Sequence, residues 1–228
     1  MAGMVFVTKS SLFVVRDIQV EVQVEGEQLI ETNSITEILG PVQGENLFLL
    51  DTKALAHKIQ LHPLVDKVGF ERRLPGTLVV KVVERHPLAL ILMGETHLLE
   101  VDGSSMILRT FEDGKWPEVT CPILTGIQPQ DITGPGQKIT DEAVFRALKC
   151  AEAIPESLRG HIDELHVEDS GSLTLYLDTR VEVRMGTHDN DAGNLLLLAE
   201  LIKSDKYVRV AQSVCYIDLT SGKPALGF

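Results

Sequence analysis

Seven histidines and three cysteines are the residues in this chain best suited to metal binding or nucleophilic catalysis. The histidines are His57, His62, His86, His97, His161, His166 and His188. No two of them have the i, i+4 spacing that would place two imidazoles on one face of a helix. Cys121, Cys150 and Cys215 are widely spaced, and none belongs to a C-x-x-C pair. The sequence therefore predicts no metal site and no catalytic thiol.

Sequence motifs of phosphate binding and acyl transfer are also missing. The chain contains no G-x-x-x-x-G-K-[ST], no G-x-G-x-x-G after a strand and no G-x-S-x-G. Two carboxylate pairs, Asp189 with Asp191 and Asp163 with Glu164, lie in predicted loops or helix starts, where the helix dipole favours acids. We expect a protein that is not an enzyme and holds no cofactor. The alternative from another class is an uncharacterised hydrolase that uses the loops of residues 110–138.

The net charge argues against nucleic acid and anionic lipid as partners. The chain has 33 acidic and 21 basic residues, which gives a net charge of -12. Its 228 residues, 44% apolar and 24% charged, are typical of one or two globular domains. The longest apolar runs, at 87–93 and 195–202, are shorter than the ~20 residues that cross a bilayer. Residues 1–11 lack the extended apolar region of a signal peptide.

The elements that would have to position a site begin with an α+β pattern. We expect strand, helix, helix, strand and strand at residues 17–25, 33–39, 52–61, 65–73 and 77–84. The first strand is predicted from strict alternation of apolar and polar residues. Asn33 or Ser34 is expected to cap the first helix, and Asp51 the second. The two helices should cover one face of a small sheet.

The remainder of the chain reads as short strands, turns and two longer helices. Strands are expected at residues 88–93, 97–101, 105–108, 162–167, 172–177, 181–185, 213–219 and 223–228. Thr140, with Asp141 and Glu142, should cap a helix that runs to Ala153. A second helix over 191–203 has a wide apolar arc and is predicted to be largely buried. Prolines and glycines make 110–138 an irregular segment, with a brief pairing at 121–124.

Several short motifs occur in the order and spacing of one known family. They are GENLFLLD at residues 44–51, HPLV at 62–65, RLPGTL at 73–78, ERHPLA at 84–89, LEVDG at 99–103, PILTG at 122–126 and YIDL at 216–219, after LFVVRDI at 12–18. Over nearly its whole length the chain resembles the extracytoplasmic part of the FtsQ/DivIB family of bacterial cell-division proteins. The chain departs from the family at two positions. Leu64 stands where the family usually has tryptophan, and Thr220 stands where the family often has an arginine directly after the isoleucine-aspartate-leucine motif.

The resemblance implies a fold of class α+β, in two domains. Residues 12–84 would be a POTRA domain of order β-α-α-β-β, and residues 85–228 a mainly antiparallel β domain with flanking helices. Residues 1–11 would be an N-terminal tail or a cloning remnant. The family carries a cytoplasmic tail and one transmembrane helix ahead of the POTRA domain. We therefore expect an excised part of a single-pass inner-membrane protein, located in the periplasm and concentrated at the division septum.

The C-terminal residues 223–228 combine small residues, glycine and a final aromatic, as in an edge strand. Such a strand exposes N–H and C=O groups that a partner strand can complete. Lys223 and Pro224 fit the alternative of an edge protected from pairing. Leu226 and Phe228 are predicted as apolar anchors, and the backbone of 225–227 as the hydrogen-bonding edge. The predicted partner-binding residues are Tyr216, Leu219, Thr220, Ser221, Gly222, Ala225, Leu226, Gly227 and Phe228.

The resemblance also implies partners. The β domain would bind the FtsB–FtsL coiled coil along its last strand, and the POTRA domain would bind FtsK or other upstream division proteins. The protein would then be a divisome scaffold that supports septal peptidoglycan synthesis. The alternative in the same broad class is a POTRA-containing outer-membrane translocation protein, which would need a barrel of many ~10-residue strands.

Overall fold

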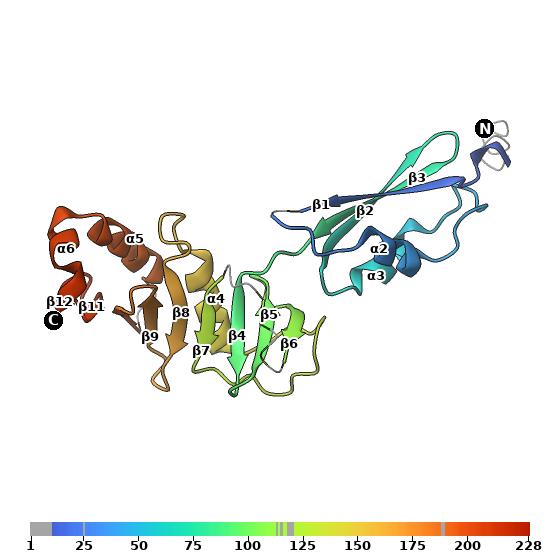
Figure 1. The fold of residues 1–228 in the computed structure, drawn as a ribbon. Coiled ribbons are helices and arrows are strands. Elements are labelled where there is room, and N and C mark those ends of the chain that lie inside the picture. Colours follow the sequence, from blue (N-terminus) through green and yellow to red (C-terminus); the bar gives the residue numbers. More distant parts are fainter. Residues whose placement is uncertain (1–10, 25, 113, 115, 118–120, 188–189) are drawn as a thin grey trace. The chain divides into compact units, whose positions relative to one another are not determined.

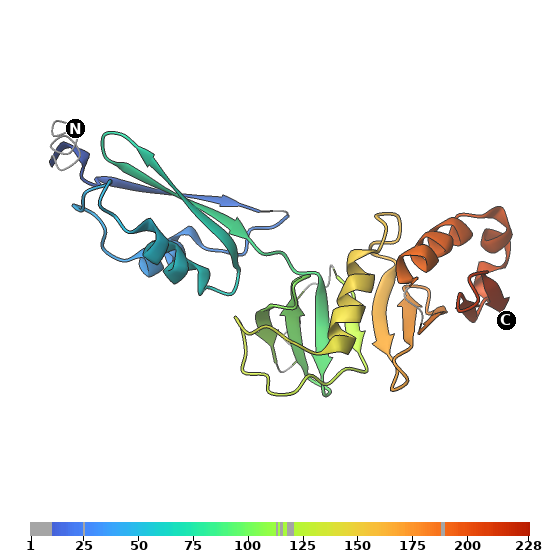
Figure 2. The same cartoon turned by 180° about the vertical axis from the view of Figure 1, so that it is seen from behind.

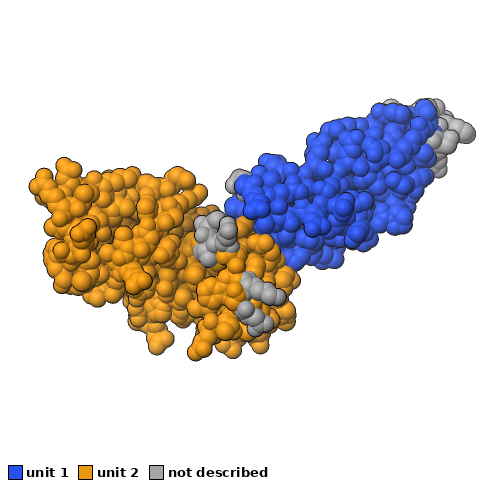
Figure 3. Space-filling model, in the orientation of Figure 1, with its two compact units in different colours: residues 1–86 blue, residues 87–228 orange. Residues whose placement is uncertain are grey.

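The computed structural model describes residues 11–228 except 25, 113, 115, 118–120, 188 and 189. The chain divides into two compact units, residues 1–86 and 87–228 (Figure 3). Each unit has its own sheet, one of three strands and one of nine. The predicted α+β class is confirmed.

The first unit is a small sheet with two helices on one face (Figures 1 and 2). Its elements are η1 (Ser11–Phe13), β1 (Asp17–Gln23), α2 (Thr32–Leu39), α3 (Thr52–Gln60), β2 (Val65–Arg73) and β3 (Thr77–Glu84). The strand order is β1-β3-β2, with β1 parallel and β2 antiparallel to β3. This arrangement confirms the predicted β-α-α-β-β order.

The core of the first unit forms between the central strand and the helices. Leu78 and Val80 of β3 are fully buried, as are Ile35 of α2 and Ile59 of α3. Asp51 caps α3 as predicted, because its carboxylate accepts hydrogen bonds from the N–H groups of residues 53 and 54. The predicted cap of α2 by Asn33 or Ser34 is wrong.

The cap position of α2 is Glu31, which makes no side-chain capping bond. Ser34 lies inside the first turn, and its hydroxyl donates to the Glu31 carbonyl at 2.7 Å. Serine side chains near helix starts can bond to nearby backbone in more than one way, so the residue type alone did not fix the cap position.

Glu84, at the end of β3, ties the segment before α2 to the sheet. Its side chain is buried, and one carboxylate oxygen accepts hydrogen bonds from the N–H groups of Leu29 (2.7 Å) and Ile30 (3.0 Å). Arg85 follows, and its guanidinium donates to the Val65 carbonyl at 3.1 Å. The glutamate-arginine motif therefore connects the end of β3 to the segment before α2 and to the first residue of β2.

The second unit is a nine-stranded sheet with helices. Its elements are β4 (Ala89–Met93), β5 (His97–Val101), β6 (Ile107–Phe111), β7 (Ile123–Thr125), α4 (Glu142–Glu152), β8 (Ile162–Val167), β9 (Leu173–Leu177), β10 (Glu182–Gly186), α5 (Asp191–Ile202), α6 (Asp205–Val210), η2 (Ala211–Ser213), β11 (Tyr216–Asp218) and β12 (Ala225–Gly227). The strand order is β12-β11-β10-β9-β8-β7-β4-β5-β6. Most pairings are antiparallel, as predicted; the pairs β4/β7, β7/β8 and β10/β11 are parallel.

Strand β7 joins the two halves of this sheet, although the sequence predicted only a brief pairing there. It lies between β4 and β8, and Leu124 at its centre is fully buried. Pro122 precedes the strand and Gly126, at φ +75°, follows it. A Cβ on Gly126 would lie 2.0 Å from the Val167 carbonyl oxygen, so close packing against β8 requires glycine here.

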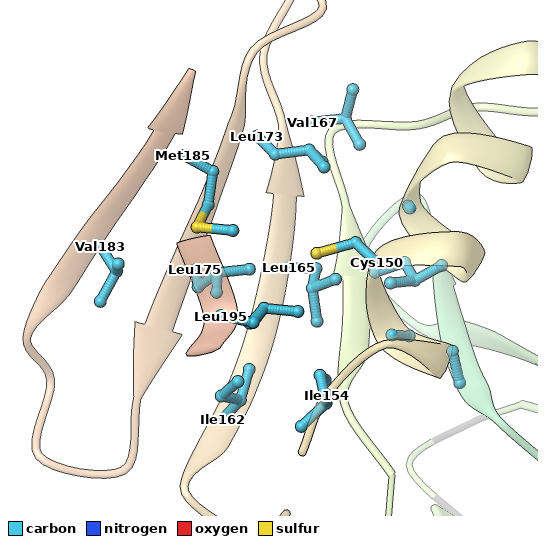
Figure 4. Packing of buried hydrophobic residues seen from close by; sticks show 14 of the residues in the cluster. Cys150, Ile154, Ile162, Leu165, Val167, Leu173, Leu175, Val183, Met185 and Leu195 are labelled. Atoms are coloured by element: carbon cyan, nitrogen blue, oxygen red, sulfur yellow. The ribbon is translucent and has the colours of Figure 1, made fainter. Parts of the chain in front are cut away.

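Buried residues of α4, α5 and strands β8–β10 meet in one hydrophobic cluster (Figure 4). Cys150 belongs to this cluster, and burial raises the pKa of its thiol to about 12, as expected for a structural cysteine. The prediction for α5 is correct in part, because Leu195 and Leu198 are buried while Leu196 is 59% exposed. Of the three residues predicted to cap α4, Thr140, Asp141 and Glu142, it is Asp141 that caps it.

Arg146 of α4 links the elements on this side of the sheet. Its guanidinium donates to Asp191, the first residue of α5, at 3.3 Å and to the Gly186 carbonyl, at the end of β10, at 2.9 Å. It also donates to the Gly171 carbonyl in the turn between β8 and β9. One side chain therefore connects both helices with the end of β10 and with the turn between β8 and β9.

Candidate functional site

The predicted site lies on the hairpin of β11 and β12, at one end of the nine-stranded sheet (Figure 1). Within the described residues, β12 pairs with β11 and no strand lies on its other side. Both strands are shorter than expected, at three residues each. The expected span of 213–219 was too long because residues 211–213 form η2 and Leu219 begins the turn.

The backbone of Leu226 faces the open edge. The Cys215 N–H donates to the Gly227 carbonyl at 2.8 Å, so the polar groups of Gly227 face β11. Successive residues of an antiparallel strand direct these groups to opposite sides. The N–H and C=O of Leu226 are therefore directed away from β11, where an added strand would lie.

Tyr216 and Gly227 form a close cross-strand pair. They are register partners, and a Cβ on Gly227 would lie 2.0 Å from the Tyr216 ring. Glycine is required because the ring occupies this space. The guanidinium carbon of Arg184, on β10, lies over the Tyr216 ring, 4.2 Å from its centroid. Arg184 also donates a hydrogen bond to Glu182 at 2.6 Å. The tyrosine thus connects β12 to β10 across β11.

The turn between β11 and β12 is built around Asp218. Its carboxylate accepts hydrogen bonds from the hydroxyl (2.7 Å) and the N–H (2.8 Å) of Thr220, and these bonds lower the pKa of Asp218. Gly222, at φ +72°, donates its N–H to the Leu219 carbonyl. A Cβ on Gly186 would lie 3.1 Å from a Thr220 methyl, so the turn also packs against the end of β10.

The predicted partner-binding residues differ in accessibility. Leu219 is fully buried in the core, so a partner cannot reach its side chain. Leu226 is half-buried and packs against the core cluster, so it does not stand free beside Phe228 as an apolar anchor. Phe228 is 71% exposed. Tyr216 is half-buried and Gly227 is buried; the exposed members are Thr220, Ser221, Gly222, Ala225 and Phe228.

Two residues of the hairpin region were missed. Arg184 and Glu182 lie beside Tyr216 because β10 and β11 pair in parallel. A local sequence pattern could not show this contact, because residues 187–215, including two helices, separate the strands. Cys215, the residue directly before β11, is exposed.

Other polar groups of the second unit have structural partners. The Thr125 hydroxyl of β7 lies 2.5 Å from a Glu164 oxygen and 2.7 Å from Nδ1 of His166, both on β8. These bonds join the central strands at the surface. In the described part of the chain, no three histidine, cysteine or acidic side chains gather as metal ligands would. His188 and Asp189 lie outside the described residues.

Two protein-family models match the chain. One, described as "POTRA domain, FtsQ-type", matches residues 19–85, and the other, "Cell division protein FtsQ/DivIB, C-terminal", matches residues 89–220. None of the helices within the described residues is long and apolar enough to cross a membrane.

Curated relatives with the name "Cell division protein FtsQ" are similar to this chain. The protein of Anaeromyxobacter sp. (strain K) is 30% identical over 185 residues, which are 79% of this chain and 60% of that protein. The protein of Geotalea daltonii is 25% identical over 171 residues, 74% of this chain and 61% of that protein. The chain thus spans about three fifths of the length of these relatives.

A solved structure of the extracytoplasmic domain of DivIB from Geobacillus stearothermophilus is also similar. It has 15% sequence identity and a TM-score of 0.37, and it covers 50% of this chain and 87% of its own.

Proposed function

Because the chain belongs to the FtsQ/DivIB family of cell-division proteins, we propose that it is a non-enzymatic scaffold of the divisome that binds a partner strand at β12. The observation that carries this proposal is the open edge of the nine-stranded sheet at β12. Edge strands are usually covered or blunted, and an open one can pair with another chain. The scaffold would support septal peptidoglycan synthesis by holding other proteins in place.

The proposed partner at β12 is the FtsB–FtsL coiled coil. A strand of the partner would complete the outward N–H and C=O of Leu226, and Phe228 would provide the exposed apolar contact. The side chains of the turn, from Thr220 to Gly222, would border the added strand. Such a contact is modest in area, at or below the standard ~1,600 Å².

The first unit would bind FtsK or other upstream division proteins, so that the two units connect early and late steps of assembly. We place the protein in the inner membrane as a single-pass protein, with this part in the periplasm at the division septum. Membership of the FtsQ/DivIB cell-division family supports this placement.

Calorimetric titration with the FtsB–FtsL ectodomains of the same organism tests the proposal. The informative pair of variants is Leu226→Pro and Leu226→Ala. Both lose the leucine packing, but proline also removes the outward N–H. Leu226→Pro should bind at least about tenfold more weakly than Leu226→Ala, since one backbone hydrogen bond of an added strand is lost and its geometry is disturbed.

Thermal unfolding of each variant shows whether the fold is kept. A variant that lacks residues 225–228 and remains folded should lose binding. The proposal is wrong if this deletion binds with the affinity of the parent chain, or if the proline and alanine variants bind alike.

A further inference from the structure

Strand β1 is a second open edge, in the sheet of the first unit (Figure 1). Its seven residues pair with β3 in continuous register from Asp17↔Thr77 to Gln23↔Val83. Among the described residues, no strand lies on the other side of β1. Alternate residues of an edge strand direct N–H and C=O groups outward, so β1 offers a longer hydrogen-bonding edge than β12.

The sequence of β1 does not blunt this edge. Natural edge strands are commonly protected by proline, by lysine or by a β-bulge. Strand β2, at the opposite edge of the same sheet, has a register shift between Val65 and Lys67 and carries several cationic side chains. Strand β1 has the sequence DIQVEVQ, with no proline, glycine, lysine or arginine. Its charged residues are both acidic.

The apolar side chains of β1 are incompletely covered. Ile18, Val20 and Val22 are half-buried, whereas their register partners on β3, Leu78, Val80 and Val82, are at most 1% exposed. The core row therefore ends at β1 with apolar surface in contact with solvent. A further strand whose apolar residues continued this row would remove that surface from water.

The other face of β1 is acidic and polar. Asp17, Gln19, Glu21 and Gln23 are exposed. Asp17 accepts a hydrogen bond from Gln19 at 2.9 Å, and Glu21 pairs with Arg73 of β2 at 3.0 Å. Opposite charges on neighbouring strands stabilise a sheet, and like charges destabilise it. Basic residues on an added strand therefore fit this face, and a second copy of β1 would place carboxylates against carboxylates.

We propose that β1 is a docking edge for an extended segment of a partner protein in which apolar and basic residues alternate. The apolar side chains extend the row of Ile18, Val20 and Val22, and the basic side chains pair with Asp17 and Glu21. The backbone of the segment completes the ladder at β1. This inference extends the proposed function, because it assigns the first unit a contact that does not depend on β12.

A labelled synthetic peptide, Lys-Val-Lys-Val-Lys-Val-Lys, is the probe for this edge. The control peptide, Lys-Lys-Val-Val-Val-Lys-Lys, has the same composition and charge without the alternation. Binding is measured by fluorescence anisotropy at ~0.15 M salt, because this salt concentration screens long-range attraction between the basic peptides and the acidic chain. We expect the alternating peptide to bind at least about tenfold more tightly, because it alone can face both rows at once. Hydrogen exchange should show protection at 17–23.

Two charge reversals locate the binding. Asp17→Lys and Glu37→Lys change the net charge equally at exposed positions, one on β1 and one on α2. Asp17→Lys should weaken peptide binding about tenfold, whereas Glu37→Lys should change it less than about threefold. The Leu226→Pro variant should bind the peptide like the parent chain, so failure at β12 and failure at β1 are distinguishable. The proposal is overturned by equal binding of the two peptides, by equal effects of the two reversals, or by protection away from β1.

Discussion

The two edge strands of the nine-stranded sheet, β6 and β12, differ in whether another segment of the chain pairs with their outer side. At β6, the Ile107 N–H donates to the Gln137 carbonyl at 2.9 Å and the Gly136 N–H donates to the Ile107 carbonyl at 2.8 Å. A bridge between Met106 and Lys138 continues this pairing. At β12, within the described residues, no segment of the chain takes the outward groups. An irregular loop of the chain pairs with the beginning of β6, so the lack of such pairing at β12 among the described residues is informative.

The largest effect is expected at the β6 end, where an ion pair with a buried carboxylate lies on β5 and β6. Glu100 is buried, and Arg109 donates to both of its carboxylate oxygens, at 2.6 and 2.7 Å. Arg109→Met leaves this carboxylate buried without its cation. We expect the free energy of unfolding to fall by about 3 kcal/mol, the lower end of the range for breaking a buried pair because Arg109 is partly exposed. Urea unfolding measures this loss.

The double variant Glu100→Leu with Arg109→Met is the control, because it removes both charges. It should recover most of the lost stability. If β6 and β12 act independently, Arg109→Met at a temperature where it is folded should bind the β12 partner like the parent chain. Weaker binding by this variant would show that the two edges are coupled and would break the comparison.

The next effect is expected at the open end, at Gly227. An alanine methyl there would overlap the Tyr216 ring, so the ring or β12 must move. Gly227→Ala should lower the free energy of unfolding by about 1–3 kcal/mol, as overpacking does. It should also weaken partner binding, because β12 carries the edge. Chemical unfolding and the calorimetric titration measure the two effects.

The Tyr216→Ala change supplies the control for Gly227→Ala. If the overlap with the ring is the cause, the double variant should lose less stability than the sum of the two single variants. Additive losses would mean that the tyrosine ring does not restrict Gly227.

Much of the first unit could be predicted from the sequence. Strict alternation over β1 gave the strand, and Asp51 gave the start of α3. These signals are local, so a single sequence contains them. The short helix α6 was missed because it has six residues, with Tyr207 as its buried member, which is too little for a periodic pattern.

The parts that could not be predicted depend on pairing between distant segments. Strand β7 has three residues in a proline-rich stretch, and its place between β4 and β8 comes from parallel pairing that leaves no local pattern. The same holds for Arg184, which β10 places over the Tyr216 ring. At the candidate site, the edge position of the last strand was predicted correctly. The burial of Leu219 and Leu226 was not, because it depends on which face of the short hairpin meets the core.

A smaller effect tests how the loop closes β6. The Gln137 side chain accepts hydrogen bonds from the N–H and hydroxyl of Thr133 and donates to the Asp131 carbonyl at 2.8 Å. Gln137→Ala removes these bonds, and we expect a loss of about 1 kcal/mol. Hydrogen exchange at Ile107 should accelerate while partner binding at β12 stays unchanged. Unchanged exchange would mean that the backbone of the loop closes β6 without this side chain.

The smallest effect concerns acid sensitivity of the open end. The pKa of Asp218 is lowered, first by the Thr220 hydroxyl and then by the Thr220 N–H. A carboxyl with a pKa below its unfolded value, about 4, stabilises the fold above that pH and loses this contribution as the pH falls through the folded pKa. As the pH is lowered below about 4, backbone NMR signals of the turn at 219–222 should therefore change at a higher pH than those of Ile107 at the β6 end. Thr220→Val keeps the methyl that packs near Gly186 and removes the hydroxyl, so it should move this transition to higher pH. A transition that is the same in Thr220→Val, or that appears equally at Ile107, would show that Asp218 does not set the acid response of the β12 hairpin.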